Sequence, residues 1–249
     1  MQCEEPTCWI RANGRIRKCS AASESLLLKN AFEWHSNLAG SPSWCGKPEQ
    51  TTGQKIRLVF ERALTDLHVI LNELGLNYAI GGSVASTAWG EPRQTNDIDI
   101  LLELPQHSSE AFRALVSTKF LLGEAEFAEA LSSKDEYRPF QLLHQEDHVK
   151  IDVFLSGTPL SASELQRATP LAITGSVSFP VLTPENIILR KLLWYRMGNR
   201  ISDRQWNDVV KVIEVQGDAL DLEYLNEWAQ RLQLTSMLEE AFADASAGD

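Results

Sequence analysis

Residues 79–104 read AIGGSVASTAWGEPRQTNDIDILLEL, and the Asp-Ile-Asp-Ile alternation within them decides the predicted fold. In a strand, side chains two positions apart point to the same face. Asp97 and Asp99 therefore project together, while Ile98 and Ile100 face a core. Two neighbouring carboxylates repel each other unless a cation lies between them. Hard oxygen ligands on an apolar strand are typical of a divalent metal site and favour Mg²⁺.

A Gly-Gly-Ser turn, Gly81–Ser83, comes directly after an apolar run and before a predicted helix. The two glycines allow a tight turn and a close approach of the backbone. Ser83 would open the helix, and the free N–H groups of a helix N-terminus form an anion site. A phosphate site beside metal-binding carboxylates is a layout for phosphoryl or nucleotidyl transfer. Each motif alone is also typical of plainer structure, an ordinary strand-to-helix turn or a solvated strand edge, so the inference depends on their combination.

Thirteen residues separate Ser83 from Asp97, and this combination of turn and strand resembles the DNA polymerase β-like nucleotidyltransferase superfamily. The run from Arg93 to Asp99, Arg-x-Thr-x-Asp-x-Asp, is more narrowly similar to the AbiEii/MenT-type toxin branch. The resemblance covers roughly residues 54–215. It implies an α/β (α+β) fold, in which a small mixed sheet of the polymerase β-like nucleotidyltransferase type is followed by a C-terminal helical part.

Asp152 is the third candidate carboxylate, a lone acid in the apolar run from His148 to Phe154. Burying it without a partner would be costly. One interpretation is a strand-edge aspartate whose carboxylate lies in water. The resemblance implies another. The superfamily's third acidic residue lies on a strand beside the Asp-x-Asp strand, so Asp152 would join Asp97 and Asp99 at one metal centre.

The toxin branch also has an active-site lysine and aspartate on successive C-terminal helices. By context, Lys191 and Asp208 match those places, although a surface lysine and an aspartate on a helix face are the plainer interpretation. The branch's usual arginine-proline-x-aspartate run reads here Arg-Gln-Trp-Asn over residues 204–207. Because of this departure, Asp203 competes with Asp208 for the role.

The mechanism implied by the resemblance is an in-line displacement with two Mg²⁺ ions, Mn²⁺ being an alternative. One ion would hold the triphosphate of an NTP such as ATP, and the other would activate an acceptor hydroxyl whose proton passes to Asp152. Arg93 is expected either to contact phosphate or to brace the loop near Asp97. The predicted catalytic residues are Asp97, Asp99, Asp152, Lys191 and Asp208, the first three as metal ligands, and the predicted nucleotide-binding residues are Gly81, Gly82, Ser83, Arg93 and Lys191.

The composition is that of an ordinary globular protein, with 249 residues, of which 43% are hydrophobic and 23% charged. No apolar run approaches the length of a membrane span and no signal peptide is visible, so we expect a cytoplasmic protein. The net charge of −11 argues against a surface coated with nucleic-acid-binding groups. Residues 190–211 nevertheless hold six basic and two acidic side chains. This local positive charge mildly favours an RNA or nucleotide-rich acceptor, although a triphosphate alone would also need it.

Three segments are predicted along the chain. Residues 1–50 hold all four cysteines and only one plausible short helix, around Ser23–Trp34, and we expect a poorly ordered appendage. Residues 54–182 are expected to form the nucleotidyltransferase catalytic domain. Residues 183–245 are expected to form a helical region that completes the active site.

Local patterns also predict individual elements. Short apolar runs predict strands at residues 76–80, 97–104, 140–144 and 149–155, whereas residues 120–136 show no clear pattern beyond a helix over 124–131. Ser161-x-x-Glu164 and Ser202-x-x-Gln205 are capping-box signatures of two helices, and Thr183 before Pro184 is a good N-cap.

Three functions are compatible with the sequence. The first is a toxin that transfers NMP to tRNA or protein and has a cognate antitoxin. The second is an enzyme that modifies an antibiotic or another small molecule. The third is a catalytically lapsed module that binds a nucleotide or a partner protein. Intact Asp97, Asp99 and Asp152 argue against the third, because a chain that had lost activity would be expected to lose one of them.

Overall fold

The computed structural model describes residues 52–95, 97–133, 135–174 and 177–247, with two short strands nearer the N-terminus. These strands, β1 (Cys8–Ala12) and β2 (Arg15–Cys19), form an antiparallel hairpin that the sequence patterns did not predict. Most of the segment 1–50, including the helix predicted around Ser23–Trp34, lies outside the described residues.

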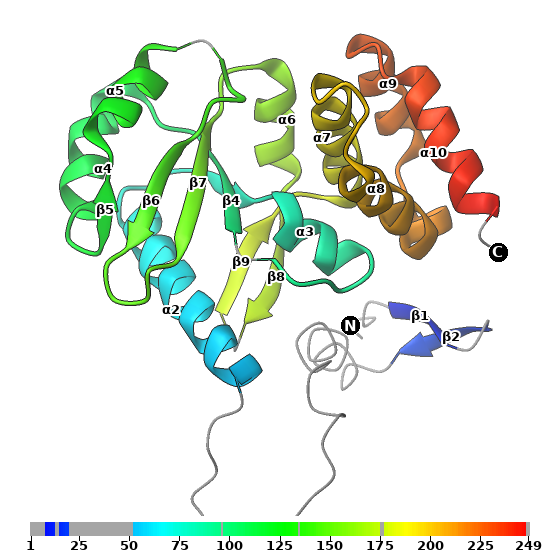
Figure 1. Ribbon diagram of the computed structural model, residues 1–249, viewed down its shortest axis with the longest axis horizontal. Coiled ribbons are helices and arrows are strands. Elements are labelled where there is room, and N and C mark those ends of the chain that lie inside the picture. The colour runs from blue at the N-terminus through cyan, green and yellow to red at the C-terminus, as the bar shows by residue number, and fades with distance from the viewer. Residues whose placement is uncertain are drawn as a thin grey trace, which may run out of the picture.

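A seven-stranded mixed sheet forms the centre of the described part (Figure 1), in the order β5-β6-β7-β4-β3-β9-β8. Parallel pairing joins β4 to β7 and β3 to β9, and the other neighbours are antiparallel. The strands are β3 (Tyr78–Ile80), β4 (Asp97–Leu102), β5 (Phe120–Leu122), β6 (Phe140–His144), β7 (Lys150–Leu155), β8 (Thr169–Thr174) and β9 (Val177–Val181). The predicted mixed α/β fold is therefore confirmed.

Helices flank the sheet, with α4 and α5 near its β5 end and α7 to α10 gathered on the other side (Figure 1). None of the described helices is long and apolar enough to cross a membrane. The helices are α2 (Thr52–Glu73), α3 (Gly82–Trp89), α4 (Ser109–Val116), α5 (Glu124–Ser132), α6 (Pro159–Arg167), α7 (Pro184–Met197), α8 (Asp203–Gln216), α9 (Leu222–Arg231) and α10 (Thr235–Ala247). Short 3-10 turns cover Gln106–Ser108 and Gly217–Ala219.

The centre of the sheet follows the predicted alternation. Ile98 and Ile100 on β4 are buried, whereas Asp97 on the opposite face is exposed. Strand β7 pairs with β4 in parallel, and Asp99 stands directly opposite Asp152. Since neighbouring strands lie about 4.8 Å apart, the two carboxylates start from adjacent positions on one face.

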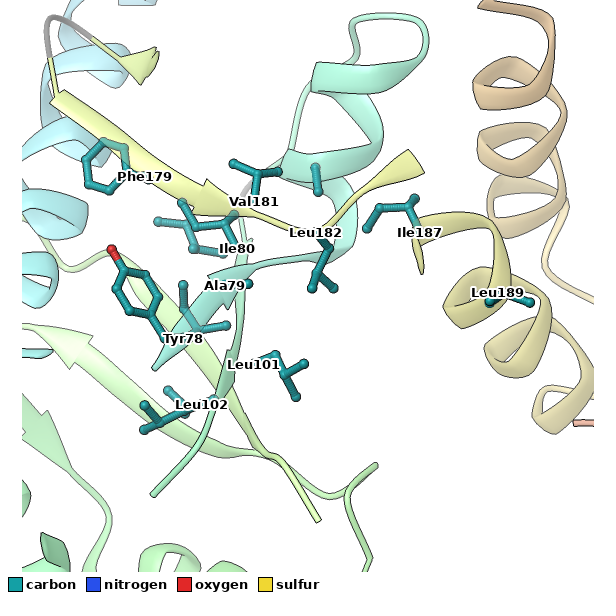
Figure 2. Packing of buried hydrophobic residues seen from close by; sticks show 14 of the residues in the cluster. Tyr78, Ala79, Ile80, Leu101, Leu102, Phe179, Val181, Leu182, Ile187 and Leu189 are labelled. Atoms are coloured by element: carbon teal, nitrogen blue, oxygen red, sulfur yellow. The ribbon is translucent and has the colours of Figure 1, made fainter. Parts of the chain in front are cut away.

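The core where β3, β4 and β9 approach α7 fixes the position of that helix (Figure 2). Ile80 and Val181, which pair across β3 and β9, are fully buried, and so is Leu189 of α7. Burying each such side chain contributes roughly 1.5–3 kcal/mol. Lys191, two residues beyond Leu189 on α7, is buried as well.

The capping box predicted at Ser161 and Glu164 is wrong. The N-cap of α6 is Thr158, which exchanges hydrogen bonds with Ser161 at the third helical position. Glu164 lies one turn further along, fully buried, where it accepts three hydrogen bonds from the Arg190 guanidinium at 2.5–2.9 Å. Glu164 therefore pairs with Arg190 on α7 and takes no part in capping α6.

Two further helix starts agree only in part with the sequence patterns. Ser202 caps α8 by accepting a hydrogen bond from the backbone N–H of Gln205 at 3.4 Å, but the Gln205 side chain is turned toward Lys191 instead of back to the cap. Helix α7 begins at Pro184 as predicted. The Thr183 side chain makes no capping bond, and its hydroxyl is buried without a hydrogen-bond partner in the described part of the chain.

Candidate active site

The three candidate metal ligands lie on one face of the β4–β7 pair. Asp97 is the most open of them, with 55% of its side chain exposed, and Asp152 has 14% exposed. Burial and then the nearby Asp152 carboxylate raise the pKa of Asp99, against the opposing effects of Lys191 and the Ser83 backbone N–H. The site therefore holds repelling carboxylates at close range without full compensation.

Because Gly82 has no side chain, it leaves room for the Asp99 carboxylate beside the start of α3. Its φ of +53° lies in the left-handed region, and a Cβ added there would lie 1.7 Å from Oδ2 of Asp99. The preceding Gly81 donates its backbone N–H to the Asp99 carbonyl at 2.9 Å, which ties the turn to β4. The Asp99 carboxylate thus lies against the start of α3 and accepts a hydrogen bond from the Ser83 N–H.

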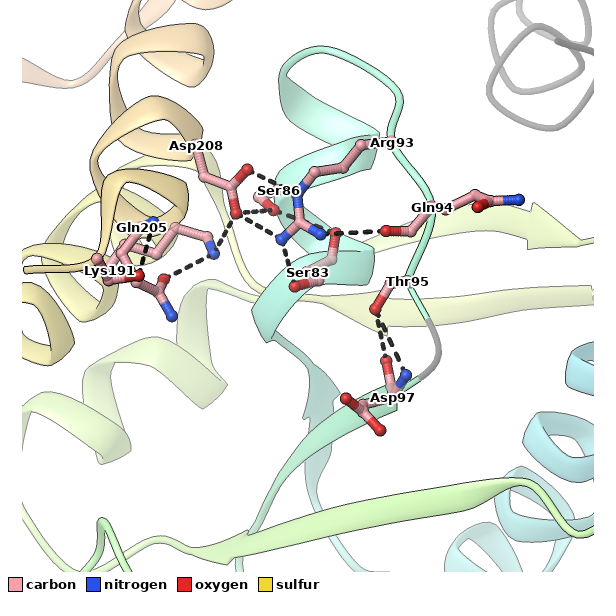
Figure 3. Close-up of polar contacts among 10 residues, drawn as sticks. Ser83, Ser86, Arg93, Gln94, Thr95, Asp97, Lys191, Gln205 and Asp208 are labelled. Carbon is pink, nitrogen blue, oxygen red and sulfur yellow. Dashed lines mark hydrogen bonds and ion pairs between the residues drawn. The ribbon is translucent and has the colours of Figure 1, made fainter.

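Asp208 joins two cationic side chains from different parts of the chain (Figure 3). Arg93 donates from Nε and Nη2 to the two Asp208 oxygens at 2.8 and 2.7 Å, a bidentate pairing. Lys191 donates to Oδ2 of the same carboxylate at 2.6 Å. Arg93 also donates to the Ser83 hydroxyl at 2.6 Å, so the start of α3 is linked to α8.

Burial and charge set the protonation behaviour of this group. Burial lowers the pKa of Lys191, although Asp208 and the more distant Asp99 act in the opposite direction. Burial alone would raise the pKa of Asp208, but the hydrogen bonds from Arg93 and the charge of Lys191 outweigh it and lower the pKa. Asp208 is therefore held as a carboxylate, whereas Asp203, the alternative suggested by the sequence, lies exposed at the start of α8.

Lys150 is a site residue that the sequence analysis missed. Its ammonium lies 3.0 Å from Oδ2 of Asp152 and 3.5 Å from Oδ1 of Asp97, on the same face of the sheet. The missed signal was its position two residues before Asp152, which in a strand places both side chains together. Gln205, which accepts a hydrogen bond from Lys191 at 3.1 Å, was also missed.

The carboxylate oxygens of Asp97, Asp99 and Asp152 are ligands of the kind that a hard divalent cation prefers. In the described residues, however, they are not arranged as a complete metal site. No three side chains of metal-binding type converge on one point within the described ranges. Oδ1 of Asp152, however, is buried and has no hydrogen-bond partner there. An unpartnered carboxylate oxygen beside a second buried carboxylate is the chemistry that Mg²⁺ coordination satisfies.

The basic run at residues 190–211 does not form a continuous positive surface. Arg190 is paired with Glu164 and Lys191 with Asp208, both in the interior. Lys211 contacts Glu91 and Glu214. A cavity of about 270 Å³ opens beside Asp208, lined by Ser86, Glu91, Arg93, Asn207, Asp208 and Lys211. These pairings account for three of the six basic side chains, whereas Arg196, Arg200 and Arg204 are exposed, so the basic run is divided between the interior and the surface.

The substitution Gly82→Ala should lower the free energy of unfolding by at least about 1 kcal/mol, because an L-residue is strained at this φ and its Cβ would displace Asp99. Urea denaturation of the purified variant measures the loss. Gly157→Ala is the matched control, since no atom lies within 4 Å of the added Cβ. Equal effects of the two substitutions would contradict the steric role of Gly82.

The substitution Asp208→Asn should destabilise the protein by about 3 kcal/mol at pH 7, because it leaves the buried Lys191 charge without its carboxylate. Since the pKa of Asp208 is lowered in the folded state, its contribution is present above the unfolded pKa of about 4 and is lost as pH falls through the folded pKa. Urea denaturation at pH 7 and pH 3 should therefore show a deficit that shrinks in acid. Asp203→Asn, an exposed change on the same helix, should cost less than about 1 kcal/mol, and a similar loss from both would count against this account.

Several solved structures resemble the chain at low identity. The antibiotic-resistance factor ANT(2'')-Ia has a TM-score of 0.47 at 16% identity and covers 75% of this chain and 96% of its own. An antigenic nucleotidyltransferase-like protein from Paracoccidioides brasiliensis has a TM-score of 0.41 at 19% identity, with 74% and 93% covered. The lincosamide antibiotic adenylyltransferase LnuA, in its lincomycin-bound form, has a TM-score of 0.38 at 13% identity, with 61% and 95% covered.

No curated protein matches the chain. A family model does, over residues 63–247, which include β3, β4, β7 and the helices that carry Lys191 and Asp208. The model is that of the nucleotidyl transferase AbiEii toxin of the Type IV TA system. Most of the chain is matched, and the protein therefore belongs to the AbiEii nucleotidyl transferase toxin family.

Proposed function

We propose that this protein transfers NMP from an NTP to an acceptor hydroxyl in an Mg²⁺-dependent reaction. The observation that carries the proposal is the in-register pairing of Asp99 with Asp152 on adjacent parallel strands, with Asp97 on the same face. Family membership supports nucleotidyl transfer as the reaction class. The paired carboxylates, placed against the start of α3, support the position of the chemistry in the chain.

Asp97, Asp99 and Asp152 are the proposed ligands of two Mg²⁺ ions, or of Mn²⁺. The unpartnered, buried Oδ1 of Asp152 and the raised pKa of Asp99 both favour a cation at this place. When bound there, Mg²⁺ would offset triphosphate charge and lower the pKa of the acceptor hydroxyl. Asp152 is the proposed acceptor of the hydroxyl proton, because its carboxylate lies opposite Asp99 on the adjacent strand.

The triphosphate is proposed to bind at the Gly81–Ser83 turn. Helix α3 begins there and offers backbone N–H groups, and the Ser83 hydroxyl already accepts a hydrogen bond from Arg93. Lys191 lies close enough to Asp99 to affect its pKa, so its ammonium can offset phosphate charge. Asp208 is proposed to act through these residues, because it fixes the Arg93 and Lys191 side chains.

This assignment uses both the segment 54–182 and the helical segment 183–245, which supplies Lys191 and Asp208. The acceptor is proposed to be the target of a toxin, a tRNA or a protein, and a cognate antitoxin is the proposed partner. The observation that favours this over a small-molecule acceptor is the match to the AbiEii toxin family.

Transfer of label from the NTP tests the proposal directly. Purified protein is incubated with each of the four NTPs, labelled on the α-phosphate, with Mg²⁺ and a cell lysate or total RNA. One labelled species is expected, and its identity as RNA, protein or small molecule defines the acceptor. Label on the γ-phosphate should not be transferred, and EDTA should abolish the reaction. Absence of α-label transfer from every NTP to any acceptor would refute the proposed function.

The substitution Asp99→Asn should reduce the labelling rate about 10²- to 10³-fold, because it removes a charge that acts in the transition state. Stability should behave differently. Because the folded pKa of Asp99 is raised, the stability linked to this group is present below its unfolded pKa and lost as pH rises through the folded pKa. A neutral amide avoids that loss, so the metal-free variant at pH 7 should resist urea as well as the parent protein or better.

Asp203→Asn serves as the activity control, because it removes an exposed carboxylate from the same protein and should leave labelling unchanged. Full labelling activity in Asp99→Asn would rule out its metal role. An unfolded Asp99→Asn variant would show instead that this aspartate is needed for the fold.

A further inference from the structure

The Lys150 ammonium lies where two of the candidate metal ligands meet. It is 3.0 Å from Asp152 and 3.5 Å from Asp97, so one cation bridges two carboxylates that come from different strands. The pairing follows from the β4–β7 register, which sets Asp97 opposite Lys150 and Asp99 opposite Asp152. The position of the lysine is thus determined by the same backbone pairing that brings the carboxylates together.

The Lys150 bridge differs from an ordinary surface ion pair because it offsets the charge of two neighbouring carboxylates. Asp97, Asp99 and Asp152 form a group of like charges on one face, and Lys191 is already paired with Asp208. The Lys150 ammonium lies within ion-pair distance of both Asp97 and Asp152, so it offsets the charge of two members of this group. Lys150 also has 37% of its side chain exposed, which leaves it room to move toward solvent.

We propose that Lys150 is an internal counter-cation that holds the carboxylates of the metal-free protein together and is displaced when a divalent cation binds. Lys150 is then a positioning residue that acts through Asp97 and Asp152. This inference rests on the proposed metal site of the nucleotidyl transferase reaction.

Competition between the Lys150 ammonium and a divalent cation predicts the direction in which the metal affinity changes when the lysine is removed. If the ammonium and the divalent cation cannot share Asp97 and Asp152, removing the ammonium must strengthen metal binding. A lysine that only supports the fold would leave the affinity unchanged or weaken it. An exposed ion pair is modest in strength, so the expected gain is about fivefold in affinity.

Mn²⁺ binding without any nucleotide tests the inference, with free Mn²⁺ measured by electron paramagnetic resonance. The variant Lys150→Met should bind Mn²⁺ about fivefold more tightly than the parent protein, whereas Lys150→Arg, which keeps the charge, should resemble the parent. In the metal-free state Lys150→Met should melt about 3 °C lower, because the aspartates repel without their counter-cation. Saturating Mn²⁺ should remove that difference.

Lys119→Met is the matched control. Its ammonium also forms an ion pair near the surface, 3.7 Å from Asp66, but Lys119 lies in the turn before β5 and Asp66 lies on α2. Its Mn²⁺ affinity should equal that of the parent protein. If Lys150→Met fails to fold, Lys150→Gln is measured in the same way.

Unchanged or weaker Mn²⁺ binding by the Lys150 variants would overturn the inference, as would absence of binding by both parent and variants. Binding by Lys150→Met alone would support it. These outcomes are independent of the α-phosphate labelling result. Labelling without a change in Mn²⁺ affinity would leave nucleotidyl transfer standing and refute only the role of Lys150.

Discussion

Repulsion between two carboxylates on adjacent strands is the constraint on which the rest of the site depends. Parallel pairing of β4 with β7 fixes Asp99 opposite Asp152, and no side-chain rotation can take them far apart. The fold accepts this cost because the buried isoleucines on the other face of β4 hold the strand in place. Charge compensation then comes from around the pair, from Lys150 on one side and from Lys191 and the Ser83 N–H on the other.

A second charged group connects α7 and α8 to the loop that follows α3. Asp208 on α8 binds Arg93 from the loop after α3 and Lys191 from α7, so three elements that are distant in sequence share one carboxylate. The side chains of Lys191 and Asp208 are buried, so each charge depends on its partner for compensation. Burial lowers the pKa of Lys191, and the neighbouring Asp208 carboxylate opposes that effect.

Local sequence patterns predicted much of the fold because they report interactions between near neighbours. The alternation at residues 97–100 gave both the strand and the face on which its acids lie. Long-range partners were not predictable in the same way. Glu164 follows the spacing of a capping box, yet its side chain pairs with Arg190 on another helix. Within the basic run, Lys191 pairs with Asp208 and Lys211 pairs with Glu91. The strand Phe120–Leu122 is too short for a period to show, and the contact of Lys150 with Asp97 depends on the register of two strands.

The shared carboxylate of Asp208 has a mechanical consequence. Arg93, Lys191 and Asp208 act as a cross-link, so α3, α7 and α8 cannot separate without breaking several charged hydrogen bonds at once. The helical side of the candidate site is thus held by a mostly buried network that reaches from Ser83 at the start of α3 to Asp208 on α8. The strand side is held by the ion pairs of Lys150 with Asp97 and Asp152, in which 55% of the Asp97 side chain and 37% of the Lys150 side chain are exposed. Because salt screens exposed ion pairs more strongly than buried ones, ionic strength acts mainly on the strand side.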